Sequence, residues 1–222
     1  MKTALIIGAS RGIGREFVRQ LLADRWKVFA TARDADALAE LAAEGAQAFK
    51  VDVTRPESLA ELPWRLDGES LDLCAYVAGV LPTWEGAAEP PTRDDFDATM
   101  HANVLGAMQV LPLIAPFVAE QRGKFVFITS MLGSIAQADS SLAWIYRASK
   151  AALNMAVHSA RTDYPDIVLS TIRPGWVQTD MGGPDAPTSV KDSVAGMRRV
   201  IDTLTLADSG SFQSYDGRKM AW

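Results

Sequence analysis

Short apolar runs alternate with segments of helical periodicity along the whole chain. The apolar runs lack the alternation of polar and apolar residues that marks a strand with one wet face, so they indicate strands covered on both faces. The predicted strands are Thr3–Gly8, Lys27–Ala32, Ala46–Val51, Leu71–Val77, Lys124–Thr129 and Val168–Arg173, and Gly210–Gln213 predicts one last short strand.

Residues with helical spacing fill the intervals between these runs. The predicted helices are 12–24, 35–43, 56–62, 94–119, 144–163 and 188–205. Strands that alternate with helices predict an α/β fold with one parallel, doubly wound sheet and helices on both faces. There is no internal repeat, and 222 residues fit a single domain, 1–222, better than two.

Composition excludes several classes of protein. A hydrophobic fraction of 48% and a charged fraction of 22% are typical of a soluble globular domain, and a net charge of −5 argues against nucleic-acid binding. Cys74 is the only cysteine, so no intrachain disulfide forms. The isolated His101 and His158 predict no metal site. We find no signal peptide and no segment long enough to span a membrane, and we expect a cytoplasmic protein.

The charge is distributed unevenly. Residues 1–33 contain seven basic and two acidic side chains, which indicates a local anionic ligand. The Pro-rich or Gly-rich segments Leu81–Thr92 and Pro174–Pro187 each follow a predicted strand. Ligands of open parallel sheets bind beyond the carboxyl ends of the strands, so both segments are candidates to border the site.

A glycine cluster follows the first strand and opens the first helix. Glycines there permit a tight turn and let the backbone approach a pyrophosphate, which the helix N-terminus attracts. This context predicts a dinucleotide site of Rossmann type formed by Gly8, Ser10, Arg11, Gly12, Ile13 and Gly14. A plain strand-to-helix turn, or another nucleotide binder such as a methyltransferase, remains an alternative.

The end of the second strand selects the cofactor. An NAD site usually has a carboxylate there, whereas this chain has Thr31-Ala32-Arg33. Arg33 suits the 2′-phosphate of NADP, and we expect Arg11 to contact the same phosphate, so NADP(H) is the predicted cofactor. Two solvated surface arginines are the alternative. Asp52-Val53 after the third strand is a candidate adenine contact, or a helix cap.

Tyr146 and Lys150 lie four residues apart in a predicted helix, so they share one face. A tyrosine with a pKa of about 10 is a poor base near neutrality, and a nearby ammonium lowers that pKa. The pair therefore indicates acid–base catalysis, although an isolated pair with this spacing is more often a surface feature.

The order of these motifs resembles the short-chain dehydrogenase/reductase family over essentially the whole chain. Details around Gly133, Tyr146–Asn154 and Val177–Met181 are similar to its small C-factor-like and Sniffer-like carbonyl reductases. The resemblance implies Tyr146 and Lys150 as catalytic residues, Ser130 as the residue that orients the carbonyl, and Asn103 as the holder of a water behind Lys150. It also implies a cofactor site completed by Lys150 and by Ala78, Gly79, Pro174, Gly175, Val177 and Thr179.

Two departures from the family pattern stand out. Tyr76-Val77-Ala78-Gly79 replaces the common Asn-Asn-Ala-Gly, so we expect a missing polar brace and a less rigid site. Ser130 precedes Tyr146 by more than the usual spacing, which indicates an inserted turn around Ala136–Leu142. Ser134 is the alternative for the serine role.

The resemblance implies an NADP(H)-dependent oxidoreductase that interconverts a small-molecule carbonyl and an alcohol. The alternative is an NADP-binding regulatory or signalling protein with little turnover. Trp84, Trp144 and Trp176 are candidates to line the substrate pocket. Helices 94–119 and 144–163 have wide apolar faces, and in this family such helices pair between subunits, so we expect a homodimer.

Overall fold

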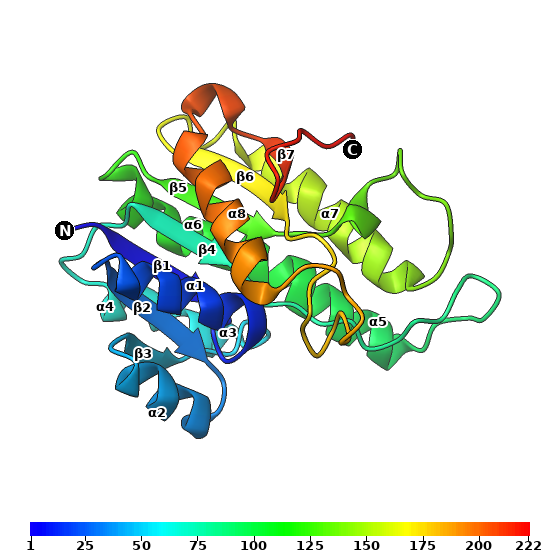
Figure 1. Ribbon diagram of the computed structural model, residues 1–222, viewed down its shortest axis with the longest axis horizontal. Helices are drawn as coiled ribbons and strands as arrows, with labels where there is room; N and C mark the ends of the chain where they lie inside the picture. Colours follow the sequence, from blue (N-terminus) through cyan, green and yellow to red (C-terminus); the bar gives the residue numbers. More distant parts are fainter.

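A computed structural model describes residues 1–222 and contains one sheet of seven parallel strands in the order β3-β2-β1-β4-β5-β6-β7 (Figure 1). All seven predicted strands are confirmed, with ends that move by no more than two residues. They are β1 (Thr3–Ile7), β2 (Lys27–Ala32), β3 (Gln47–Lys50), β4 (Leu73–Tyr76), β5 (Lys124–Ile128), β6 (Val168–Arg173) and β7 (Ser211–Ser214).

The helices lie in the predicted intervals. They are α1 (Gly12–Ala23), α2 (Ala35–Ala43), α3 (Pro56–Leu59), α4 (Leu62–Arg65), α5 (Arg93–Met100), α6 (Gly106–Ala119), α7 (Trp144–Ala160) and α8 (Val190–Thr203), with 3₁₀ turns η2 (Met131–Gly133) and η3 (Leu206–Asp208) and a π-helical turn η1 (His101–Leu105).

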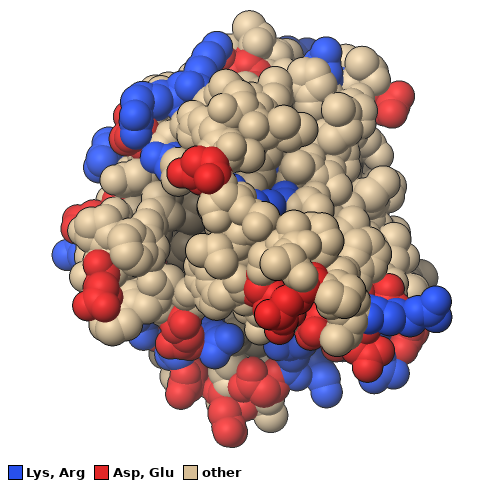
Figure 2. All heavy atoms as spheres, turned by 90° about the vertical axis from the view of Figure 1, so that its right-hand side faces the viewer, with Lys and Arg blue, Asp and Glu red and all other residues tan.

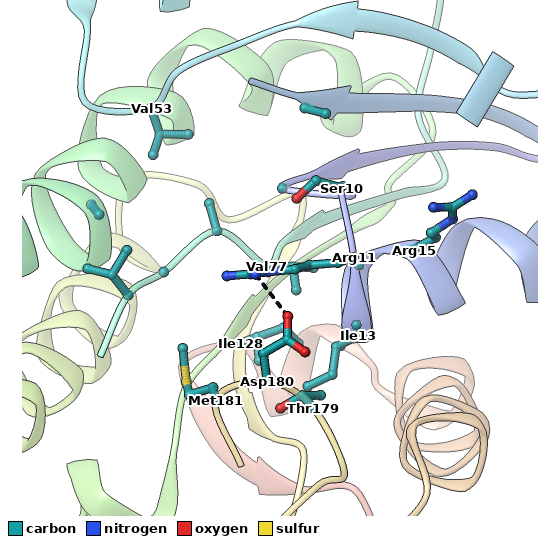
Figure 3. A pocket seen from close by; sticks show the side chains of 18 of the residues that line it. Ser10, Arg11, Ile13, Arg15, Val53, Val77, Ile128, Thr179, Asp180 and Met181 are labelled. Atoms are coloured by element: carbon teal, nitrogen blue, oxygen red, sulfur yellow. Dashed lines mark hydrogen bonds and ion pairs between the residues drawn. The ribbon is translucent and has the colours of Figure 1, made fainter. Parts of the chain in front are cut away.

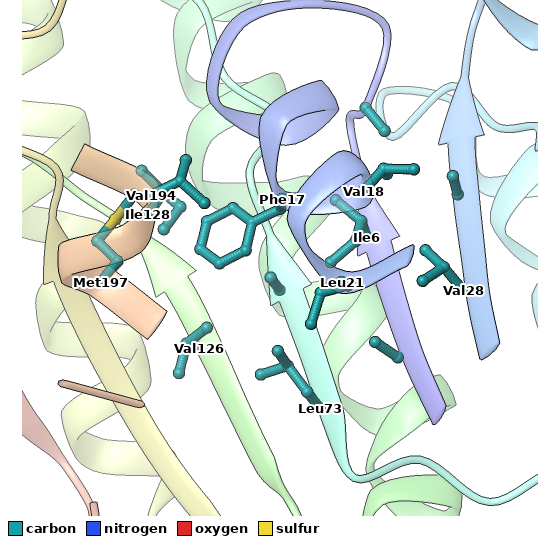
Figure 4. Close-up of a cluster of buried hydrophobic side chains, with 14 of the residues drawn as sticks. Ile6, Phe17, Val18, Leu21, Val28, Leu73, Val126, Ile128, Val194 and Met197 are labelled. Atoms are coloured by element: carbon teal, nitrogen blue, oxygen red, sulfur yellow. The ribbon is translucent and has the colours of Figure 1, made fainter. Parts of the chain in front are cut away.

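Two apolar clusters cover the two faces of the sheet. Successive strand residues point to opposite faces, so Ile6 belongs to the cluster under α1, α2 and α8, whereas Leu5 belongs to the cluster under α3, α4, α6 and α7. Figure 4 shows Phe17 of α1 directed toward Met197 of α8 above the sheet. The doubly wound architecture predicted from the sequence is therefore confirmed.

Two predicted helices differ from the observed ones. The segment 56–62 is helical only as α3, and a second short helix, α4, begins at its last residue and continues to Arg65. Pro63 lies in the first turn of α4, where its missing N–H is tolerated. The segment 94–119 is helical throughout, but η1 interrupts its α-helical hydrogen bonding between α5 and α6. π-helical turns of this kind are frequent at functional sites.

The expectation that no segment is long enough to span a membrane is wrong in its literal form. The continuous helical stretch Arg93–Ala119 meets the criterion by length and composition, although more than half of its apolar window is buried within the protein. Val110, Ile114 and Val118 of α6 are fully buried in the cluster on the sheet. A core helix of a soluble protein passes the same test.

The strand order reverses direction between β1 and β4, which is the topological switch point where open α/β sheets bind ligands. The loops that follow the strands gather at one end of the molecule. The segments 81–92 and 134–143 project there, at the right of Figure 1. Figure 2 views this end and shows a hollowed face whose centre is covered mostly by uncharged side chains.

Candidate active site

A cleft of about 520 Å³ opens at the carboxyl ends of the strands. Its walls come from the loops after β1, β2, β3 and β4, from the end of β5, from α7 and from the loop after β6. It is lined by most of the predicted cofactor residues, namely Gly8, Ser10, Arg11, Gly12, Ile13, Gly14, Arg33, Asp52, Val53, Ala78, Gly79, Lys150, Pro174 and Thr179, and also by Tyr146. Figure 3 shows part of this lining.

The glycine loop forms a backbone cradle at one end of the cleft. Gly8 has a φ of +88°, and a Cβ at this residue would lie 2.7 Å from the amide nitrogen of Ala78. A Cβ on Gly14 would lie 2.1 Å from the carbonyl oxygen of Gly8. Arg11 at the N-cap of α1 makes no side-chain capping bond, so the first N–H groups of the helix are available to an anion. This cradle fits a pyrophosphate.

The cleft contains an excess of cations in an acidic protein. Four arginines and one lysine line it together with three carboxylates. Arg15 forms ion pairs with Glu40 of α2 and with Glu44, the C-cap of that helix. Exposed Arg33 forms no ion pair, so its guanidinium is the one most available to a ligand phosphate.

The phosphate contact expected of Arg11 and Arg33 stays a prediction, and in this structure Arg11 has a partner within the protein. Its guanidinium points across the cleft and donates to Asp180 at 2.8 Å (Figure 3). Both side chains are more than 70% exposed, so this pair contributes little to stability. It is a weak bridge between the glycine loop and the loop after β6.

The adenine contact stays a prediction, and the N-cap of α3 is Arg55 rather than Asp52, which lines the cleft. The Asp52 Oδ1 atom accepts from the amide and the hydroxyl of Thr54, which shapes the turn before α3. Burial acts to raise the pKa of Asp52, but the hydrogen bonds from Thr54 and the charge of Arg33 outweigh it and lower the pKa. The carboxylate therefore lines the cleft in its charged form near neutral pH.

The opposite end of the cleft contains an unsatisfied polar atom. Thr129 lines the cleft next to Ile128, and its buried hydroxyl has no hydrogen-bond partner in the protein. Buried polar groups are almost always paired, so this hydroxyl fits a site whose partner is a ligand. The residue types in both halves of the cleft thus fit a dinucleotide.

Two predicted cofactor residues do not line the cleft. Gly175 has a φ of +89° and packs on the ring of Tyr215, where a Cβ would lie 2.8 Å from that ring. Val177 is buried and pairs with Thr188. Both residues shape the loop that places Thr179 and Met181 in the cleft wall, and their contact with the cofactor stays a prediction.

Tyr146 and Lys150 lie together on α7, as their spacing predicts. Both side chains are buried, and the Lys150 Nζ atom lies 5.5 Å from the centroid of the Tyr146 ring. Nζ donates to the carbonyl oxygen of Ile128 at 3.0 Å. The pair lies in the lining of the cleft rather than on an outer helix face, so the surface alternative is wrong.

The pKa values of this pair shift in a direction that the sequence did not predict. Burial raises the pKa of Tyr146 to about 12, and a hydrogen bond with Ser130 offsets part of the rise. Burial lowers the pKa of Lys150 to about 8. The phenol therefore stays protonated near neutral pH and is suited to donate a proton.

The two candidate serines have different partners. Ser130 lies beside Tyr146, where its side chain acts to lower the pKa of the phenol, and the Ser130 hydroxyl accepts from the Leu132 amide at the start of η2. Ser134 is buried, and its hydroxyl donates to the carbonyl of Ala221 in the C-terminal tail. Gly133 allows η2 to lie directly on α7, because a Cβ there would be 2.8 Å from the backbone of Lys150. Ser130 is thus the serine beside the tyrosine.

The extra residues between Ser130 and Tyr146 form an irregular segment, as expected. No helix or strand occurs between η2 and α7. Ser141 and Ala143 of this segment contact the loop after β4 through the bonds Ala87 N–Ser141 Oγ (3.2 Å) and Ala143 N–Trp84 O (3.3 Å). Trp84 and Trp176 are largely exposed and do not line the cleft.

Asn103 lies in η1 with its side-chain amide fully engaged. Its Oδ1 atom accepts from the Val80 amide at 2.8 Å, and its Nδ2 atom donates to the Val80 carbonyl and to the Ser149 hydroxyl. The expected water relay is not tested by these contacts. They make Asn103 a link between the loop after β4 and helix α7.

Tyr76 corrects the expectation of a missing polar brace. Its hydroxyl donates to the carbonyl oxygen of Ala102 at 2.8 Å. A tyrosine thus provides a polar bond to the helix beside the strand, at the position where the family pattern has an asparagine pair. No local sequence pattern predicts this contact, because it joins residues 26 positions apart.

Sequence reasoning also missed several cleft residues. Thr129, Arg15 and Met181 line the cleft but carry no motif. For Thr129, its position directly before Ser130 at a strand end was the available signal.

The chain is similar in sequence to a known protein family and to individual members of known name. The sequence profile of the family described as short chain dehydrogenase matches residues 2–189. The protein named C-signal from Myxococcus xanthus is 41% identical over 155 residues, which cover 68% of this chain and 93% of that protein.

Two solved structures share the fold over their full length. The carbonyl reductase Sniffer of D. melanogaster aligns with a TM-score of 0.92 and 27% identity and covers 100% of both chains. A carbonyl reductase from Pseudomonas aeruginosa PAO1, in complex with NADP, aligns with a TM-score of 0.87 and 30% identity and also covers 100% of both chains.

The buried lysine predicts a stability cost at neutral pH. Lys150→Met should stabilise the folded protein near pH 7 by about 1–3 kcal/mol, because it removes a charge that burial disfavours. The folded-state pKa of about 8 lies below the ordinary 10.5. The unfolded chain therefore binds the extra proton between these values, and wild-type stability rises with pH in that window.

Urea unfolding at about pH 7 and about pH 10 measures this effect. The advantage of Lys150→Met should shrink at the higher pH, while Lys191→Met, at an exposed position on α8, should change little at either pH. A less stable Lys150→Met protein at pH 7, or an advantage that grows with pH, would contradict the prediction.

Proposed function

The chain belongs to the short chain dehydrogenase family, and from this membership we propose that it is an NADP(H)-dependent oxidoreductase that interconverts a carbonyl and an alcohol through Tyr146. Membership of that family excludes the methyltransferase alternative. The observation that carries the proposal is the buried pair of Tyr146 and Lys150 in the lining of the cleft, with the half-buried Ser130 beside the tyrosine.

The choice of NADP(H) rests on charge and on relatives. The unpaired Arg33 lies at the cleft edge after β2, where a carboxylate would favour NAD. A guanidinium binds a phosphate by two parallel charge-assisted hydrogen bonds. The carbonyl reductase from Pseudomonas aeruginosa was solved with NADP, which supports the same cofactor here.

The residues of this chain divide the chemistry among them. A bound nicotinamide supplies the hydride that reduces the carbonyl carbon. Tyr146 donates its phenolic proton to the carbonyl oxygen, since burial keeps that phenol protonated at neutral pH. Ser130 donates a hydrogen bond that orients the same oxygen. Lys150 holds the cofactor ribose and provides positive charge beside the phenolate that forms.

One relative supports a second candidate function. The relative from Myxococcus xanthus has the name C-signal, so a signalling protein that binds NADP(H) with little turnover is the alternative. It predicts cofactor binding without carbonyl reduction.

We infer in addition a cytoplasmic homodimer that acts on a small-molecule substrate. Apolar side chains on the outer surfaces of η1, α6 and α7 support the dimer: Leu105, Met108 and Met155 are 43%, 54% and 66% exposed. Exposed apolar groups on two neighbouring helices favour association with another copy.

The assignment of Tyr146 predicts a loss of turnover without a loss of cofactor binding. Tyr146→Phe should lower kcat/KM for NADPH-dependent reduction of aldehydes and ketones by about 10²–10⁴-fold, because no other group supplies the proton. NADPH affinity, measured by fluorescence titration, should change little. Tyr164→Phe, a tyrosine outside the cleft, is the matched control.

Near-normal turnover by Tyr146→Phe would refute the catalytic assignment. A wild-type protein that binds NADPH but reduces none of a broad panel of carbonyl compounds would favour the signalling alternative.

Arg33 predicts cofactor selectivity. Arg33→Ala should weaken NADPH binding by about 10–100-fold and leave NADH binding nearly unchanged, since a charged hydrogen bond contributes about 1.5–3 kcal/mol. Dissociation constants for both cofactors measure this. Arg65→Ala on α4, outside the cleft, should alter neither constant. Equal weakening for both cofactors would place the 2′-phosphate elsewhere.

The dimer predicts a mass of about 48 kDa in light scattering coupled to size-exclusion chromatography, twice the 24.0 kDa of the chain. Met155→Glu should shift the protein to the monomer, because it introduces a charge into the expected apolar contact. Trp64→Glu, at an exposed aromatic on α4, should not. A monomeric wild-type protein would refute this inference.

A further inference from the structure

Behind the cleft, a chain of hydrogen bonds joins strand β4 to the two helices that carry the site. We propose that Tyr76 is a positioning residue: through η1 and Asn103 it holds the Gly79–Val80 wall of the cleft against Lys150. The proposal rests on the function proposed above, and Tyr76 itself does not line the cleft.

The first contact is the bond from Tyr76 to η1. Tyr76 is the last residue of β4 and is fully buried, and its ring packs 5.9 Å from that of Phe127. Its hydroxyl donates at 2.8 Å to the carbonyl of Ala102, the second residue of the π-helical turn. A π-helical turn departs from the regular ladder of helical bonds, so an external donor at this carbonyl fixes the turn.

Gly106, directly after η1, leaves the space that this hydroxyl occupies. A Cβ on Gly106 would lie 2.6 Å from the Tyr76 Oη atom and 2.8 Å from the carbonyl oxygen of Val53. The helix backbone at Gly106 therefore packs directly against the Tyr76 hydroxyl and against the backbone of the loop after β3. Tyr76 and Gly106 form a matched pair, since any larger side chain at 106 would displace the tyrosine hydroxyl.

The position of η1, held by Tyr76, determines where Asn103 lies. One residue beyond Ala102, its amide group bonds both backbone groups of Val80 and the hydroxyl of Ser149, and that hydroxyl donates to the carbonyl of Tyr146 at 2.8 Å. The bonds from Tyr76 through Asn103 thus reach both the wall of the cleft and the first turn of α7.

Gly79 marks the end of this chain of contacts. A Cβ on Gly79 would lie 3.0 Å from Asn103 Oδ1 and 3.3 Å from Lys150 Nζ. Asn103, the Gly79 backbone and the lysine head group are therefore in close packing, with no room for another side chain. A shift of η1 moves Asn103 and changes the environment of Lys150 directly.

Tyr76→Phe removes the hydroxyl and retains the ring that packs in the core. We expect kcat for NADPH-dependent carbonyl reduction to fall at least about tenfold, because small displacements of catalytic groups have large effects on rate. The KM for the carbonyl compound should change less than about threefold, since Tyr76 does not touch the substrate site.

A second readout does not depend on turnover. The Val80 amide, which donates to Asn103 Oδ1, should exchange its hydrogen at least about tenfold faster in Tyr76→Phe, measured by hydrogen–deuterium exchange of this segment. Phe125→Leu is the control: it alters the same buried aromatic group, in which Phe125 stacks on Phe127, without touching η1. It should lower thermal stability yet leave kcat and Val80 exchange unchanged.

Gly106→Ala provides a test by coupling. In the wild-type background its methyl group displaces the Tyr76 hydroxyl and should lower kcat, whereas in the Tyr76→Phe background it has more room and should lower kcat less. The double-mutant cycle should therefore show non-additive effects.

The outcomes separate this inference from the function proposed above. If the wild-type protein reduces no carbonyl compound, the proposed function is refuted. Hydrogen–deuterium exchange of the Val80 amide then still tests the role of Tyr76. Normal kcat and normal Val80 exchange in a folded Tyr76→Phe protein, or equal changes in Phe125→Leu, would overturn the inference.

Discussion

The burial of the Lys150 ammonium beside Tyr146 is the constraint on which the site depends. A lysine is tolerated in a protein interior only where its charge finds partners and its neighbours leave space. Here Nζ donates to the Ile128 carbonyl, and two glycines make room: Gly79 beside the head group and Gly133 beside the backbone. Ile128 and Gly133 belong to the end of β5 and the turn after it, whereas Gly79 follows β4. The parallel sheet must therefore bring β4, β5 and α7 together before the lysine can be accommodated.

The same burial shifts the pKa values of Tyr146 and Lys150 in opposite directions. Desolvation disfavours the charged form of each, so it raises the pKa of Tyr146 to about 12 and lowers the pKa of Lys150 to about 8. A phenol that remains protonated is the form required for reduction of a carbonyl. The free-energy cost of a buried lysine is thus linked to function, as expected where active sites trade stability for activity.

Backbone geometry and charge make the other half of the cleft. Gly8 brings the first loop against the backbone of Ala78, Gly14 packs the start of α1 on Gly8, and α1 begins without a side-chain cap. Basic side chains gather there although the protein carries a net charge of −5. Most of them form ion pairs with Asp180, Glu40 or Glu44. Arg33 forms no ion pair, so its charge is available to a ligand.

The sequence by itself determined the strands, the doubly wound order, the glycine loop and the Tyr146–Lys150 pair, because apolar runs, glycines and helical spacing are local signals. Only the tertiary structure decided the direction of Arg11, the choice of Ser130 over Ser134 and the π-helical turn held by Tyr76. Arg11 meets Asp180 169 positions away, Ser134 meets Ala221 87 positions away, and Tyr76 meets Ala102 26 positions away. Such partners are set by how the chain packs, since a hydrogen bond between distant segments leaves no periodic trace in the order of residues.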